Sequence, residues 1–144
     1  MTEMKRVRVT LHTTVRNGQD EETYELTTFG TFQEKGDSLY LRYKEVQEDL
    51  QEIQSTVKWS KDEVFIMRNG QVKMRQKFIK DMMTVGNFES PYGTLQMLTT
   101  AKDLKHEYKE RYAEGTMTLI YDLTMQGADA GQYKMVIEYK EETQ

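Results

Sequence analysis

The sequence predicts an all-β fold, an antiparallel meander closed into a calycin-like (lipocalin-like) barrel of about 8–10 strands. Apolar side chains recur at every second position along most of the chain, which is the period of a half-buried strand. Turn-forming pairs such as Asn17-Gly18 and Asn69-Gly70 separate these runs, as in β-hairpins. The 144 residues suffice for one core, so we expect a single domain over residues 1–144.

The alternating runs follow one another through short connections. In the first run Val7, Val9 and Leu11 share one face, and the turn at residues 17–18 ends the run. Gly30 lies inside the second run, where a glycine is typical of a bulge or of a sharp bend at a barrel corner. The expected runs cover residues 6–18, 22–37, 38–46, 53–59, 63–78, 82–88, 92–101, 106–113, 115–125 and 132–142.

Two stretches, residues 43–53 and 100–115, are also rich in helix-forming residues. For the first we predict a long hairpin connection with a helical turn, around the acidic segment Gln47–Gln51. In the second, the alternation that includes His106 and Tyr108 favours strands over a helix.

The only proline of the chain lies in the sequence Ser90-Pro91-Tyr92-Gly93. Proline at the second position and glycine at the fourth position are typical of a type I β-turn. An anion-binding loop would need several glycines or a following helix, and a strand follows here. We therefore predict a corner between two strands.

Composition restricts the class of protein. The chain has no cysteine, which excludes disulfides and thiolate metal sites and favours a reducing compartment. Neither a signal-peptide pattern nor a membrane-spanning apolar run is present in the sequence. The net charge of −4, from 24 acidic and 20 basic side chains, argues against a dedicated nucleic-acid-binding protein. We expect a cytoplasmic protein with a charged exterior.

Four segments resemble a known family. They read "GTFQEKGDSLYLRYKE", "IMRNGQVKMRQKF", "GNFESPYGTLQMLT" and "GTMTLIYDL". They are similar to the YwiB-like proteins, small uncharacterised bacterial domains, and the resemblance covers essentially the whole chain. It implies a calycin-type (lipocalin-like) barrel, and it implies no reaction and no catalytic residues. The Gly-X-Trp motif of true lipocalins is absent near the N-terminus, since Trp59 lies mid-chain, so extracellular transport does not follow from the resemblance.

The expected inner faces are rich in methionine and tyrosine. The chain has ten methionines and nine tyrosines, and a small barrel is just wide enough for its own side chains or for one small ligand. We predict a non-catalytic binding module for an amphipathic or hydrophobic small molecule; the open alternative is that these side chains only fill the core. The candidate lining residues are Tyr43, Trp59, Met74, Phe78, Met97, Tyr121 and Tyr133.

An alternative hypothesis uses basic residues on the outside of one hairpin. Arg68, Lys73, Arg75 and Lys77 lie within residues 63–78, opposite the expected apolar face. Such a patch could meet a phosphate or an acidic partner, as in a protein- or nucleic-acid-interaction domain, although charged outer faces of sheets are usually just solvated. A homodimer is also compatible with the sequence.

An enzyme is the weakest hypothesis. His12 and His106 are the only histidines, and they show no metal-ligand spacing. Neither a glycine-rich phosphate loop nor a Gly-X-Ser-X-Gly nucleophile motif is present. The sequence therefore assigns no catalytic residue, metal or cofactor, and His106 would be the first residue to test in an enzyme.

Overall fold

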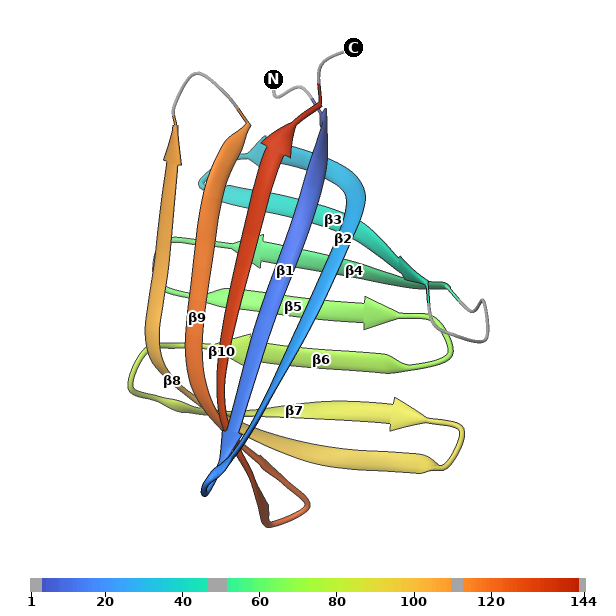
Figure 1. Cartoon of the computed structure of the whole chain (residues 1–144), viewed down its shortest axis with the longest axis vertical. Coiled ribbons are helices and arrows are strands. Elements are labelled where there is room, and N and C mark those ends of the chain that lie inside the picture. The colour runs from blue at the N-terminus through green and yellow to red at the C-terminus, as the bar shows by residue number, and fades with distance from the viewer. Residues whose placement is uncertain (1–3, 47–51, 110–112, 143–144) are drawn as a thin grey trace.

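The computed structural model describes residues 4–46, 52–109 and 113–142, and these form a barrel of antiparallel strands (Figure 1). Each strand pairs with its neighbours in the chain, and the first pairs with the last, which closes the barrel. The predicted closed meander is therefore confirmed. The strands are β1 (Lys5–Asn17), β2 (Asp20–Lys35), β3 (Ser38–Val46), β4 (Glu52–Trp59), β5 (Val64–Asn69), β6 (Lys73–Phe78), β7 (Met83–Ser90), β8 (Gly93–Lys109), β9 (Glu114–Met125) and β10 (Ala128–Glu141).

The barrel is made of two layers that cross each other. In Figure 1, β3 to β7 run across the view, whereas β1, β9 and β10 run along it in front of them. The long strand β2 belongs to both layers, because it pairs with β1 from Asp20 to Phe32 and with β3 only from Gly30 onward. A Cβ at Gly30 would overlap the carbonyl oxygen of Arg42, so only glycine allows this approach. The predicted corner at Gly30 is confirmed.

The strand β8 is longer than the sequence pattern indicated. Residues 92–101 and 106–113 were expected as two separate strands, whereas one strand covers Gly93–Lys109. Its register against β9 shifts between Ala101 and Asp103, and pairing with β7 ends at Thr100. A β-bulge lets one strand bend between two layers, so no turn is needed here. Residues 110–112, like the predicted helical turn near Gln47–Gln51, lie outside the described residues.

The predicted turns are confirmed in position. Asn17 pairs with Asp20, and Gly18 carries the positive φ of 66° that the tight turn requires. At the proline corner the hydroxyl of Ser90 accepts a hydrogen bond from the Tyr92 N–H at 3.1 Å. The Tyr92 side chain is 99% exposed, as expected of a corner.

The barrel interior is packed at one end and hollow at the other. The packed end lies where β2 meets β3 and β4 meets β5, and its fully buried side chains include Phe78, Leu41, Met117, Leu119 and Ile137. The hollow end lies toward the β5–β6, β7–β8 and β9–β10 turns. No helix in the described part of the chain is long and apolar enough to cross a membrane.

Candidate ligand-binding pocket

The hollow end of the barrel contains a pocket of about 320 Å³. Five of the seven lining residues expected from the sequence line it, namely Tyr43, Met74, Met97, Tyr121 and Tyr133. They come from β3, β6, β8, β9 and β10, so residues far apart in the sequence meet around one space. The pocket reaches the surface beside Tyr24 of β2, whose side chain also lines it and is 56% exposed.

The other two expected residues point inward but lie outside the pocket. Phe78 is fully buried and packs edge-on against Tyr121, with ring centroids 4.9 Å apart. It supports a wall of the pocket from the packed side. Trp59 ends β4 at the packed end of the barrel, where its ring lies 5.4 Å from that of His106. The structure therefore places neither residue against a ligand in this pocket.

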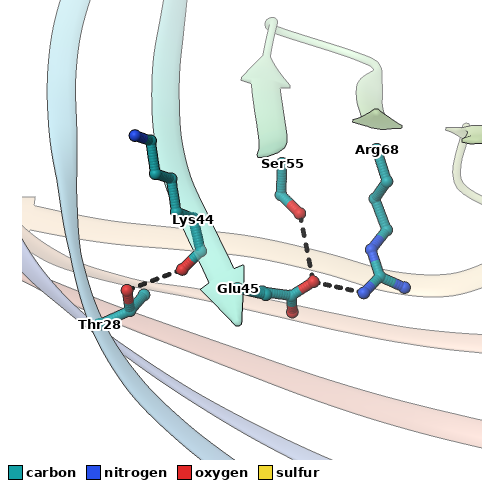
Figure 2. Close-up of polar contacts among 5 residues, drawn as sticks. All are labelled: Thr28, Lys44, Glu45, Ser55 and Arg68. Carbon is teal, nitrogen blue, oxygen red and sulfur yellow. Dashed lines mark hydrogen bonds and ion pairs between the residues drawn. The ribbon is translucent and has the colours of Figure 1, made fainter. Parts of the chain in front are cut away.

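A half-buried ion pair lies in the pocket wall (Figure 2). Arg68 on β5 donates from Nη2 to Oε2 of Glu45 on β3, and the two side chains are 27% and 17% exposed. Ser55, on the strand between them, donates to the same Glu45 oxygen at 3.5 Å. The predicted position of Arg68 on the outer basic face is wrong, because Arg68 pairs with inward-facing Met74 and lines the pocket.

A second polar contact lies deeper in the barrel. Gln76 and Thr99 are 3% and 1% exposed, and Gln76 Nε2 donates to Thr99 Oγ1 at 2.9 Å. Gln76 also lines the pocket. One wall of the pocket therefore presents an amide among apolar side chains.

The inward-facing tyrosines of the pocket stay protonated. Burial raises the pKa of Tyr43 and of Tyr121 well above the usual range, and the positive charge of Arg68 acts in the opposite direction on both. Burial also raises the pKa of Tyr133, whose ring stacks on that of Tyr121 with centroids 5.2 Å apart. Neutral hydroxyls can donate hydrogen bonds as well as accept them. The pocket thus combines hydrogen-bond donors with apolar walls.

Glu45 and Gln76 also line the pocket, and neither was among the lining residues expected from the sequence. Both follow the period-two rule, since Glu45 comes two residues after Tyr43, and Gln76 two residues after Met74. The alternation therefore indicates that both side chains point inward. Their polarity suggests the opposite, because polar residues on strands usually face water.

The outer face of β3 to β6 carries the remaining basic residues of the hairpin. Lys73, Arg75 and Lys77 of β6 are exposed. The strand register aligns Arg75 with Met67, Thr56 and Arg42, and aligns Lys77 with Phe65, Lys58 and Tyr40. The face is therefore a mixture of basic and apolar side chains, and Lys77 also lies 3.8 Å from Glu63. Arg6 and Arg8 lie on β1, which is not a neighbour of these strands.

The two histidines lie apart from the pocket. His12, on the outside of β1, is 3.4 Å from Glu25 and 3.3 Å from Glu138. His106 shares a hydrogen bond of 2.7 Å with the Tyr139 hydroxyl, and burial lowers its pKa to about 4. Among the described residues, no three His, Cys, Asp or Glu side chains are grouped closely enough to hold a metal ion.

Comparisons with known proteins agree with the barrel topology. The chain is 29% identical over 134 residues to the uncharacterized beta-barrel protein YwiB of Bacillus subtilis (strain 168), covering 92% of each chain. The crystal structure of the ywiB protein from Bacillus subtilis superposes with a TM-score of 0.85 at 25% identity, over 97% of this chain and 94% of that one. A family model described as a domain of unknown function, DUF1934, matches residues 9–137. The chain therefore belongs to the DUF1934 family of YwiB-like β-barrel proteins.

Proposed function

We propose that this protein is a non-catalytic binding module for a small amphipathic molecule, which occupies the hollow end of the barrel. The observation that carries the proposal is the composition of the pocket wall. Seven of the eighteen lining residues are methionine or leucine, among them Met97, Met135 and Leu123, whereas Arg68 and Tyr43 provide polar atoms. Ligand pockets are commonly apolar with a few convergent polar groups.

The size of the pocket sets the size of the ligand. One water molecule occupies about 30 Å³ in the liquid, so a space of about 320 Å³ has room for roughly ten non-hydrogen atoms. Methionine side chains can adjust to ligands of different shape, because they are unbranched and flexible. A straight-chain alcohol such as octan-1-ol matches both the volume and the mixed character of the wall.

Native mass spectrometry of the freshly purified protein is the first test. A mass excess that disappears on denaturation would identify a retained ligand and give its mass. Titration with octan-1-ol, followed by ¹H–¹⁵N NMR, tests the empty protein in the same way. We expect saturable shifts at residues around the pocket, such as Gln76 and Met97.

A pair of matched variants locates the binding. Met135→Trp places a larger side chain in the pocket wall, whereas Met83→Trp makes the same change on the outside, where Met83 is 62% exposed. We expect Met135→Trp to abolish octan-1-ol binding and Met83→Trp to leave it unchanged. Equal binding by the two variants, or no saturable binding by the unmodified protein, would contradict the proposal.

A second candidate function uses the outer face of β3 to β6. The support for this function is the strand register. It aligns Arg42 with Arg75 across the sheet. In the neighbouring row it aligns Lys58 with Lys77, and Phe65 lies between these two lysines. Basic side chains that flank aromatic rings suit an extended polyanion, such as single-stranded nucleic acid. This function would act independently of the pocket.

Fluorescence anisotropy with a labelled oligo(dT) tests the second candidate. We expect binding that weakens steeply as salt is raised, because phosphate contacts release counterions. The charge reversal Arg75→Glu should abolish binding, whereas Arg8→Glu, on a distant strand, should not. Binding that is insensitive to both changes would exclude this face, and an acidic peptide that binds in place of the oligonucleotide would indicate a protein partner.

A further inference from the structure

The ion pair in the pocket has an unusual position. Pairs removed from water gain little net stability, because desolvation offsets most of their attraction. Arg68 and Glu45 nevertheless lie in the wall of the pocket, with most of each side chain withdrawn from solvent. A guanidinium carries five N–H donors arranged to bind a carboxylate through two of them. The contact with Glu45 runs from Nη2 alone to Oε2.

The two partners are held to different degrees. Arg68 lies in β5 between two paired strands, opposite Ser55 of β4 and Met74 of β6. Glu45 of β3 pairs on one side only, with Ile53 of β4, because the pairing of β3 with β2 ends at Tyr43. Figure 2 shows the Glu45 side chain at the tip of the β3 arrow. The backbone carbonyl of the preceding residue, Lys44, accepts a hydrogen bond of 2.7 Å from the Thr28 hydroxyl. This hydrogen bond holds the backbone next to Glu45, so the carboxylate would leave Arg68 through a change of side-chain rotamer.

The surroundings of Arg68 favour an oxygen acceptor. Tyr43 and Tyr121 line the same pocket as Arg68, and burial keeps both hydroxyls protonated. Arg68, Tyr43 and Tyr121 therefore provide three hydrogen-bond donors in the wall of one pocket. Met74 and Phe88, which oppose each other across β6 and β7, line the adjoining apolar wall.

We propose that the pocket selects molecules with an apolar chain and a carboxylate, and that the ligand carboxylate replaces Glu45 on Arg68. Glu45 then acts as an internal competitor, which compensates the charge of Arg68 while the pocket is empty. The inference rests on the proposed small-molecule binding in this pocket. It adds the chemical class of the ligand and names Arg68 as the residue that distinguishes an acid from an alcohol.

The test compares octanoate with octan-1-ol, which have similar chains and different head groups. Dissociation constants from NMR titration would be measured for the unmodified protein, Glu45→Gln, and the double variant Glu45→Gln/Arg68→Met. Glutamine keeps the shape of Glu45 but is a weaker acceptor, so octanoate should bind Glu45→Gln about tenfold tighter or more. Octan-1-ol should bind with unchanged affinity. The double variant leaves no unpaired charge, so it should fold and lose the preference for octanoate.

The outcomes separate the two proposals. A preference for octanoate that grows in Glu45→Gln and disappears in the double variant supports the inference. Equal affinity for acid and alcohol in all three proteins overturns the inference and leaves the proposed binding function intact. If neither compound binds any of the three, both proposals are overturned. A preference for octanoate over octan-1-ol that survives in the double variant also overturns the role of Arg68.

Discussion

The substitution Thr99→Val tests whether the buried polar pair is essential to the barrel. Valine has nearly the same shape as threonine, so the change removes the oxygen that accepts from Gln76 Nε2 at 2.9 Å and little else. Both side chains are at most 3% exposed, so the amide would be left without its partner in an apolar region. A buried donor left unsatisfied costs about 1–3 kcal/mol.

This magnitude is within reach of ordinary denaturation experiments. A loss of about 1–3 kcal/mol corresponds to a fall in melting temperature of roughly 2–12 °C for a chain of this size. Urea denaturation followed by circular dichroism gives the free energy of unfolding directly. Thr100→Val is the matched control, because Thr100 is the adjacent residue and is only partly buried. We expect the control to change stability by less than about 0.5 kcal/mol.

The double variant Gln76→Met/Thr99→Val decides the interpretation. If the loss in Thr99→Val comes from the orphaned amide, removing the amide as well should restore most of the stability. A single variant as stable as the unmodified protein would refute the reasoning, because it would show that the amide finds water in the adjoining pocket. A double variant no more stable than Thr99→Val would attribute the loss to packing.

Two further predictions concern the corner and the packed end. Gly30→Ala should lower the free energy of unfolding by about 3 kcal/mol or more, since the new Cβ would overlap the Arg42 carbonyl; an unchanged urea midpoint would contradict this close approach. The pKa of His106 is about 4 in the folded protein and about 6.5 when unfolded, so its contribution to stability is complete above pH 6.5 and is lost as the pH falls toward 4. The melting temperature should therefore fall more steeply below pH 6.5 in the unmodified protein than in His106→Gln. Parallel plots of melting temperature against pH for the two proteins would contradict this prediction.

The fold was predictable from the sequence because alternation and turn chemistry are local signals. Period two assigned Val7, Val9 and Leu11 to the inside, and the structure buries all three. The long strand β8 was not predictable in one piece, because its bulge at Ala101 to Asp103 interrupts the alternation as a turn would. Local patterns do not show whether such an interruption ends a strand or bends it.

The residues that line the pocket were only partly predictable. Alternation shows which side chains point into the barrel, but it does not show at which end of the barrel they lie. Trp59 and Phe78 were correctly assigned to the interior, but they lie at the packed end. Arg68 shows the opposite failure. Its charge suggested the outside, whereas its spacing from Val64 and Ile66 placed it inside. The closure of the barrel determines which inward residues surround the space, and closure depends on contacts between distant strands.

The unequal ends of the barrel imply that stability and binding respond to different substitutions. Ile137 and Met135 are two residues apart on the same face of β10, yet Ile137 is fully buried and Met135 lines the pocket. Ile137→Ala leaves a cavity in a packed region and should cost about 2–5 kcal/mol. Met135→Ala removes a side chain that already borders open space, so its cost should fall below that range.

The same pair should separate in binding. Met135→Ala enlarges the pocket, so we expect it to bind decan-1-ol more tightly than the unmodified protein does. In Ile137→Ala the relative affinity for the two alcohols should not change. Calorimetry with octan-1-ol and decan-1-ol measures both effects. If the two substitutions destabilised the protein equally and left the chain-length preference unchanged, the division into a packed end and a binding end would be wrong.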